Sequence, residues 1–343
     1  FHRRAWRRVT PPPADARGIT ASDLMTEDAL DEQIVGRAVG DWIYVAVITG
    51  FALCVPILLA LVFWEVALAG WPALREFGFG FLTSSVWDPV RGQFGAAPAV
   101  FGTIVTSILA LVIATPLALG VSIFLSEYAP GWLRQPVAFF VDLLAAIPSV
   151  VYGLWGIFVL VPILRQHVVP FLRDTLHLGV IPLFSGPSWG NSVFAAGVIL
   201  AIMVLPYITS VSREVLLAVP RSQREAALAL GATRWEMIQK AVIPFAKSGI
   251  IGGIILGLGR ALGETMAVTM VIGNRHEIAA SLFAPGYTMA SLIANEFQEA
   301  SGDLHLAALM AVGFVLLVVT FIVNAIARWL VWQVGRKATG ATT

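Results

Sequence analysis

Six long runs of apolar residues, separated by polar stretches, dominate the pattern along the chain. They lie near residues 43–64, 99–125, 137–164, 193–217, 248–272 and 306–333. Each is long enough to cross about 30 Å of hydrocarbon as a helix, which takes about 20 residues. The alternation of apolar and polar residues that marks membrane barrels is absent. The pattern therefore predicts an all-α integral membrane protein with six transmembrane helices.

The composition supports this class. Of the 343 residues, 58% are hydrophobic and 13% are charged, whereas about a quarter of the residues in soluble domains are charged. The first apolar run follows some forty polar residues and is too long for a cleaved signal peptide. The single cysteine, Cys54, lies in an apolar run, so we expect no intrachain disulfide. Because the sequence begins at Phe1 instead of Met, we expect the natural chain to start further upstream.

The distribution of Lys and Arg predicts the orientation. If the N-terminus is cytoplasmic, the inner side collects 16 of the 22 Lys and Arg residues and the outer loops hold five. Without the five arginines far from the first span, eleven against five still favours this orientation. We therefore expect a cytoplasmic arm, 1–41, and a six-helix domain, 42–343. Its external loops would be 65–98, 165–190 and 273–305, and its longest cytoplasmic loop 218–247.

The arm has two parts. Its first residues, RRAWRRVTPPP, are basic and then proline-rich, which favours an extended or disordered segment. Residues 21–42 predict an amphipathic helix, with Leu24, Ile34, Val35 and Ala38 near one face. That helix is either a solvated surface helix or an arm along a neighbouring subunit.

The cytoplasmic loop PRSQREAALALGATRWEMIQKAVIP, 220–244, predicts two short helices. Ser222 with Glu225, and Thr233 with Glu236, have the spacing of capping boxes. Gly231 lies where a helix that ends near Leu230 needs a left-handed residue. The apolar residues of the loop, Ala226, Ala227, Leu230, Trp235 and Ile238, favour either a hairpin folded onto its own bundle or a docking surface for a soluble partner.

Arg260 and Glu264 stand out in the fifth apolar run, because a charge near the middle of a membrane costs at least about 2.5–3.5 kcal/mol on insertion scales. On one helix they would share a face with Gly257, whose small size permits close helix packing. One interpretation is an ion pair facing the bundle. The interpretation that we favour is a substrate pathway, because a guanidinium fork matches two oxygens of an oxyanion. The Thr265 hydroxyl would either add a donor to this pathway or bond back to a carbonyl of its own helix.

The cytoplasmic loop also carries a family resemblance. Glu225-Ala226-Ala227, with Gly231 six residues and Pro244 nineteen residues after Glu225, resembles the EAA loop of ABC-importer permeases, although Ala241 and Ile243 depart from the usual residues. The resemblance implies the type I permease fold of binding-protein-dependent transport. It also implies that this loop couples the permease to an ATPase, through Glu225, Ala226, Ala227, Gly231, Thr233, Trp235 and Glu236.

Residues 81–107 (FLTSSVWDPVRGQFGAAPAVFGTIVTS) and 257–274 (GLGRALGETMAVTMVIGN) resemble the phosphate permeases of the PstC/PstA family, and the long arm and first external loop favour its PstC branch. The resemblance implies a phosphate-importing permease of the bacterial inner membrane, with both termini cytoplasmic. Its implied partners are a PstA-like permease, two PstB-like ATPase subunits that hold ATP and Mg, a PstS-like external phosphate-binding protein and membrane lipid. Nucleic acid is not expected.

Several expectations accompany this function. The chain has no phosphate-binding G-x-x-x-x-G-K-[ST] loop and no nucleophile–base constellation, so we expect no enzyme activity and no cofactor of its own. The histidines are scattered in external segments and do not suggest a metal site. Glu127 is expected to pair with Arg213 or Arg134. The alternatives are a permease of the same fold for sulfate or molybdate, or a proton-coupled secondary transporter that uses Arg260 and Glu264.

The external segment 71–98 is rich in aromatic residues, among them Trp71 and Trp87. Two interpretations remain open for it. The rings help to receive the external binding protein, or they form an aromatic belt at the membrane interface.

Overall fold

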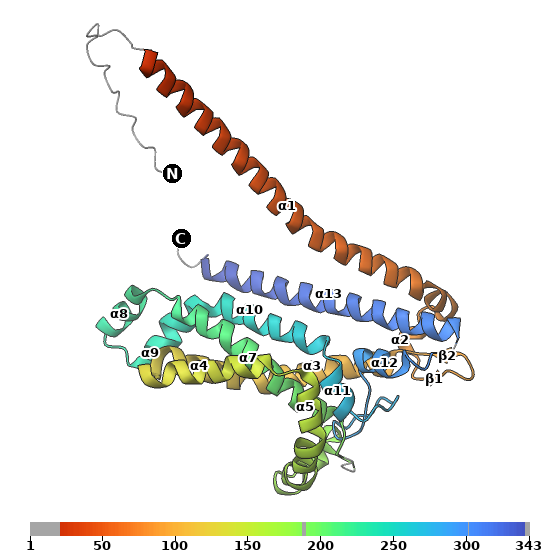
Figure 1. Cartoon of the computed structure of the whole chain (residues 1–343). Helices are drawn as coiled ribbons and strands as arrows, with labels where there is room; N and C mark the ends of the chain where they lie inside the picture. The colour runs from red at the N-terminus through yellow and green to blue at the C-terminus, as the bar shows by residue number, and fades with distance from the viewer. Residues whose placement is uncertain (1–20, 187–189, 301, 340–343) are drawn as a thin grey trace. The chain divides into compact units, whose positions relative to one another are not determined.

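The computed structural model describes residues 21–186, 190–300 and 302–339, with side chains from Trp42 onward except at position 330 and at 334–339. The chain is helical almost throughout (Figure 1). The longer helices are α1 (Ala21–Phe77), α3 (Ala97–Ile123), α4 (Gly131–Ala146), α7 (Val193–Leu217), α10 (Ile243–Leu262) and α13 (Asp303–Thr339). Shorter elements are α2 (Gly80–Thr83), α5 (Ser149–Trp155), α6 (Val161–Ile163), α8 (Arg221–Ala229), α9 (Arg234–Met237), α11 (Met266–Val271), α12 (Met289–Glu296), and the strands β1 (Trp87–Asp88) and β2 (Gln93–Phe94).

Tight or wide helical turns join several of these helices. The π-helical turns are η1 (Phe124–Tyr128), η2 (Gly156–Leu160), η3 (Leu164–Val168), η4 (Phe171–Thr175) and η7 (Ile238–Val242). The 3-10 turns are η5 (Leu178–Val180) and η6 (Pro182–Phe184).

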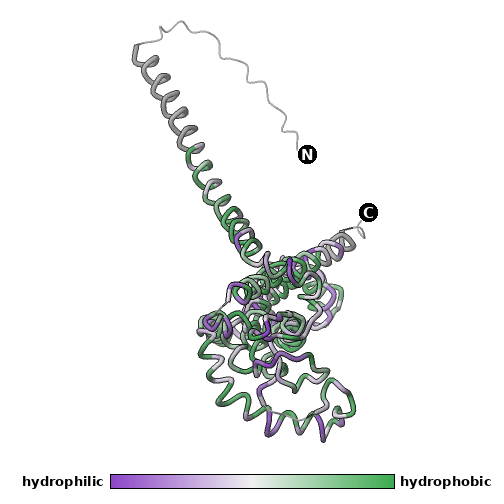
Figure 2. The backbone as a smooth tube through the Cα atoms, turned by 90° about the vertical axis from the view of Figure 1, so that its right-hand side faces the viewer, coloured by the Kyte–Doolittle hydropathy of each residue, from purple (hydrophilic) through white to green (hydrophobic). Residues whose placement is uncertain are grey.

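Six helical stretches of the described chain are long and apolar enough to cross a membrane. They are Trp42–Phe77, Ala97–Tyr128, Ser149–Thr175, Val193–Leu217, Arg234–Leu262 and Asp303–Gln333. The six-helix prediction is therefore confirmed. The hydrophobic colour along the described part of α1 in Figure 2 marks the first of them.

The helix predicted for 21–42 is continuous with the first span, because α1 begins at Ala21 and ends only at Phe77. The apolar face predicted for residues 21–42 stays a prediction. The basic segment before Ala21 lies outside the described residues. The chain divides within α1 into two units, Phe1–Val62 and Phe63–Thr343. The predicted division at residue 41 also stays a prediction. The candidate site residues all belong to the second unit.

The third span differs from its prediction, 137–164. Helix α4 ends at Ala146, Ile147 is extended with ψ of 129°, and a new helix begins at Ser149. The cause is Pro148, which has no N–H to donate and disfavours helical geometry in the residue before it. The chain changes direction at this point (Figure 1). The third candidate span is consequently Ser149–Thr175, and α4 is a separate helix that packs against α7.

Helices α3, α7 and α10 form the centre of the bundle, with α13 against α10 (Figure 1). Three alanines of α3 spaced four residues apart, Ala110, Ala114 and Ala118, are fully buried in this core. Small side chains let helix backbones approach closely. The close approach increases van der Waals contact, which helps to drive the association of membrane helices. The α8–α9 loop lies at one end of the bundle, and the hairpin of β1 and β2 lies with α12 at the other (Figure 1).

The end with the hairpin has its own apolar cluster. Trp87 pairs with Phe94 across the two short antiparallel strands. Phe81, Phe94, Met289 and Leu309 are buried together in this cluster, so α2, the hairpin, α12 and α13 form one packed unit.

A glycine-to-alanine pair on α3 tests this packing. A Cβ at Gly102 would overlap the carbonyl oxygen of Tyr287, whereas a Cβ at Gly120 would meet nothing within 4 Å. We expect Gly102→Ala to destabilise the protein by about 1–3 kcal/mol through overpacking. Gly120→Ala should leave stability unchanged or raise it by up to about 1 kcal/mol, because alanine is the better helix former. Thermal unfolding of the two purified variants in detergent measures the difference. Equal midpoints would contradict the close approach at Gly102.

Candidate functional site

Arg260 and Glu264 form an ion pair, which is one of the two interpretations that the sequence left open. The Nη2 atom of Arg260 lies 3.1 Å from Oε2 of Glu264. The two side chains differ in environment, because that of Glu264 is 3% exposed and that of Arg260 is 40% exposed. A buried carboxylate therefore holds one nitrogen of a guanidinium whose side chain is partly exposed.

The pair does not lie on one continuous helix, which corrects the predicted fifth span, 248–272. Helix α10 ends at Leu262, and α11 begins at Met266 after a turn at Gly263. Glu264 lies in this break, and its Oε1 accepts a hydrogen bond from the N–H of Ala267 at 3.3 Å. The carboxylate thus satisfies one of the free N–H groups at the start of α11. The same side chain joins the end of one helix to the beginning of the next.

Gly257 and Thr265, the other predicted pathway residues, lie differently around the break. A Cβ on Gly257 would stand 2.9 Å from Cγ1 of Ile208 on α7, so this buried glycine permits close packing of α10 and α7. Thr265 lies in the break itself, where its hydroxyl donates to the carbonyl of Gly263 at 3.4 Å. Contact of either residue with a substrate stays a prediction.

The predicted helix pair of the cytoplasmic loop is present as α8 and α9, but only one of its two capping boxes forms. Thr233 accepts from the Glu236 N–H at 3.3 Å, and Glu236 Oε2 accepts from the Thr233 N–H at 2.9 Å. The capping box predicted at Ser222 was wrong. Helix α8 begins at Arg221, after an extended Pro220, and has no side-chain cap.

Gly231 separates the two helices with a left-handed backbone, φ +84°, as predicted. Around it, Leu230 is 90% exposed and Trp235 is 50% exposed. Glu225 and Ala226 are also exposed, and Ala227 is half-buried. A concavity of about 390 Å³ lies here, lined by Ala227, Leu230, Gly231, Ala232, Glu236, Lys240 and Ala241. The loop therefore presents apolar groups on a concave surface, and it is not folded entirely onto its own bundle.

Glu127 pairs with neither of the arginines expected from the sequence. Its Oε1 lies 2.9 Å from Nη2 of Arg224 on α8, and the side chains are 8% and 18% exposed respectively. Arg134 instead donates to the carbonyls of Ser126 and Ala129. The sequence prediction missed Arg224 because its partner lies 97 residues away. Its place directly before Glu225 in the family motif was the one available signal.

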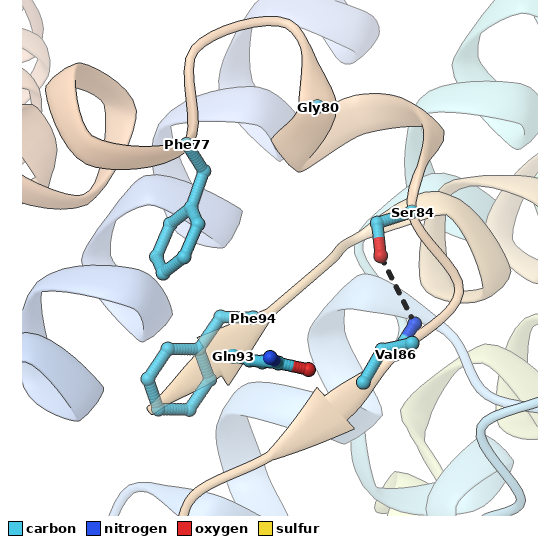
Figure 3. Close-up of a pocket in the computed structure, with 6 residues that line it drawn as sticks. All are labelled: Phe77, Gly80, Ser84, Val86, Gln93 and Phe94. Carbon is cyan, nitrogen blue, oxygen red and sulfur yellow. Dashed lines mark hydrogen bonds between the residues drawn. The ribbon is translucent and has the colours of Figure 1, made fainter. Parts of the chain in front are cut away.

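The opposite end of the bundle contains a second concavity, of about 300 Å³, beside the hairpin. Figure 3 shows its six lining residues, with the N–H of Val86 donating to the hydroxyl of Ser84 at 3.2 Å. The Trp87 ring is turned toward the cluster, with its centre 5.3 Å from that of His276 and 6.0 Å from that of His305. Two of the histidines that were expected to be scattered therefore lie around one tryptophan.

Burial lowers the pKa of His276, while its bond to the Gly95 carbonyl and the charge of Glu296 act in the opposite direction. The unfolded chain consequently binds a proton at this site more readily than the folded protein does. Above the ordinary pKa of histidine, the neutral His276 leaves the free energy of unfolding at its full value. As the pH falls through and below that pKa, the unfolded chain takes up a proton first, and the free energy of unfolding decreases.

Comparison with known proteins identifies the family. Residues 116–334 match the family model described as "Binding-protein-dependent transport system inner membrane component". The "Phosphate transport system permease protein PstC" of Mesorhizobium japonicum is 47% identical over 89% of this chain and 93% of its own length. The protein of the same name from Pasteurella multocida is 47% identical over 84% of this chain and 90% of its own. The chain belongs to the PstC family.

The fold agrees with this membership. A solved structure of the MetNI methionine ABC transporter in inward-facing conformations is similar to this PstC-family chain with a TM-score of 0.50 and 18% identity. The similarity covers 69% of this chain and 94% of the other. At this level of identity the likeness concerns the fold alone, which is that of ABC-importer permeases.

Proposed function

We propose that this chain is the membrane-spanning permease subunit of an ATP-driven importer of inorganic phosphate. Its membership of the PstC family, whose members named above are phosphate transport permeases, supports the proposal. The observation in the structure that carries it is the Arg260 side chain, 40% exposed at a break in the fifth span and held by a buried carboxylate.

The geometry around Arg260 suits a weakly held oxyanion. A guanidinium has five N–H donors and stays charged in proteins. Contact with Glu264 occupies one terminal nitrogen, Nη2, so the rest of the planar fork can bind two phosphate oxygens. Glu264 holds the guanidinium in place when no anion is bound, or accepts the proton of hydrogen phosphate, which sulfate lacks. Because the carboxylate competes with the anion for the same cation, binding is weak enough for release.

The rest of the transporter follows from the family. We infer a pathway between this chain and a PstA-like permease, with a PstS-like binding protein delivering phosphate from outside. Two PstB-like ATPase subunits hold ATP and Mg on the cytoplasmic side. The distribution of Lys and Arg favours cytoplasmic termini in the bacterial inner membrane. The α8–α9 loop docks on an ATPase subunit through the exposed residues around Gly231.

Uptake into proteoliposomes tests the function. The purified complex of this chain with the partner permease, the ATPase subunits and the binding protein should accumulate radiolabelled phosphate only when ATP is supplied. Excess unlabelled phosphate should abolish uptake of the label, and excess sulfate or molybdate should not. Competition by sulfate or molybdate would indicate a permease for another oxyanion. Uptake that persists without ATP and follows a proton gradient would indicate a secondary transporter.

The hairpin gives a prediction about the binding protein. Trp87 packs inward, but Val90 at the hairpin tip is 96% exposed. We expect a photocrosslinker at position 90 to capture the external phosphate-binding protein in at least one nucleotide state. A crosslinker at Phe321, which is 75% exposed on α13 in a membrane span, is the matched control and should capture none. Failure at position 90 in every nucleotide state would leave only the aromatic-belt interpretation of this loop.

A further inference from the structure

Arg224 joins three parts of the protein that are distant in sequence. From its position on α8, it contacts Glu127 in the π-helical turn that ends the second span, with Nη2 to Oε1 at 2.9 Å and Nε to Oε1 at 3.3 Å. The same guanidinium donates to the carbonyl of Leu216 at 2.7 Å and to the carbonyl of Val219. Leu216 lies in the last turn of α7 and Val219 lies two residues after its end, so the guanidinium contacts the chain where α7 finishes. The Leu216 carbonyl also accepts from the N–H of Val219 at 3.3 Å.

Besides Arg224, helix α8 reaches the bundle through Ala227, which is half-buried against the apolar cluster of Leu216 and Val219. None of its residues, all of which the structure describes, is buried. The following segment differs, because Met237, Ile238 and Val242 are buried in an apolar cluster with Leu216 and Val219. The second half of the loop is therefore held by buried apolar side chains, whereas α8 is held by the Arg224 guanidinium and the half-buried Ala227. Bonds from a cation to a carboxylate and to helix C-terminal carbonyls are among the stronger polar contacts in proteins.

The two helices that Arg224 contacts are joined to each other and to the substrate candidate. The hydroxyl of Ser122 on α3 donates to the carbonyl of Thr209 on α7 at 3.0 Å. Helix α7 packs closely against α10. Val211 of α7 lies against Gly253 of α10, and Ile208 of α7 lies against Gly257 of α10. Arg260 lies one turn further along α10. A displacement of α8 that moved the ends of α3 and α7 would therefore reach the helix that carries Arg260.

We propose that Arg224, held by Glu127, is a positioning residue that transmits movement of α8 to the inner ends of α3 and α7. The proposal rests on the proposed function, because it assigns a role in coupling ATP hydrolysis to transport. Arg224 does not touch substrate in this role. A residue that only stabilised the fold would affect assembly or unfolding temperature, but not the number of phosphate ions moved per ATP.

The test measures that ratio in the complete complex in proteoliposomes, with radiolabelled inorganic phosphate and ATP hydrolysis followed together. In Arg224→Lys, which keeps the charge and loses the fork, phosphate moved per ATP hydrolysed should fall about tenfold. Glu127→Gln keeps the carbonyl contacts of Arg224 and should lower the ratio less. Two controls should match the wild type. Arg221→Lys changes an exposed arginine of α8, and Arg134→Lys changes the arginine bonded to Ser126 and Ala129.

The outcomes separate the role of Arg224 from the proposed function. A wild-type ratio in assembled Arg224→Lys complexes would overturn the role of Arg224, whatever the change in stability. If Arg224→Lys does not assemble, Glu127→Gln decides, and a wild-type ratio there overturns the proposal. A wild-type complex that takes up no phosphate with ATP would overturn the proposed function itself, and this inference with it.

Discussion

Replacement of Arg260 by lysine should reduce phosphate uptake about tenfold or more while the complex still assembles. Lysine keeps the positive charge and can still approach Glu264, but it lacks the planar pair of donors that binds two oxygens at once. Loss of a charged hydrogen bond costs about 1.5–3 kcal/mol, and about 1.4 kcal/mol already corresponds to a factor of ten. Uptake per correctly assembled complex, measured in proteoliposomes, gives the result.

Arg173→Lys is the matched control. Arg173 is 42% exposed and also pairs with a carboxylate, Asp174, at 2.9 Å. Its exposure therefore nearly equals that of Arg260, but it lies at the end of the third span, away from the break at Gly263. This control should transport normally. Near-normal turnover in Arg260→Lys would contradict a contact between Arg260 and phosphate, and the ion pair with Glu264 would then have a structural role only.

Glu264→Gln tests the role of the Glu264 carboxylate charge separately from that of Arg260. Glutamine has nearly the same size, and its amide oxygen can still accept from the N–H of Ala267, so the start of α11 should remain intact. The change removes the negative charge that competes with the anion for Arg260. We expect partial loss of uptake and an altered dependence of uptake on pH, because the protonation state of phosphate then matters differently. An unchanged pH profile with a lower unfolding temperature would indicate that Glu264 only stabilises the break.

The break itself shows what periodicity could not predict. Apolar residues continue at helical spacing through 248–272, so hydropathy gives no sign of an interruption. The structural reason is local, because the Glu264 carboxylate bonds the Ala267 N–H and starts a new helix after Gly263. In the third span the signal was present in Pro148, but the apolar run on both sides favoured one continuous helix.

The cytoplasmic loop shows the same division between local and distant causes. Thr233 and Gly231 were predicted correctly, because a capping box and a left-handed cap depend on a few consecutive residues. Ser222 failed because Pro220 places it inside the first turn of α8 instead of at its cap. The contact of Arg224 with Glu127 joins residues 97 positions apart, and no local rule could have paired them.

Gly231→Val is expected to uncouple ATP hydrolysis from transport. The backbone at Gly231 has φ +84°, a region that costs a β-branched residue about 1–3 kcal/mol or more. Since a Cβ there would meet nothing within 4 Å, the strain is conformational and does not come from a clash with neighbours. The chain relieves it by changing the angle between α8 and α9, which alters the surface around Leu230 that we propose docks on the ATPase.

Gly231→Asn is the control for this prediction, because asparagine adds a larger side chain than alanine yet tolerates the left-handed region. ATP hydrolysis and phosphate uptake should both remain near the wild-type level in Gly231→Asn. In Gly231→Val, uptake per ATP hydrolysed should fall, or the ATPase subunits should separate from the purified complex. Thermal unfolding of the isolated chain should change little in either variant, because Gly231 lies outside the buried clusters of the bundle. If the valine variant assembles and couples as well as the asparagine variant, the conformation at Gly231 is not required for docking.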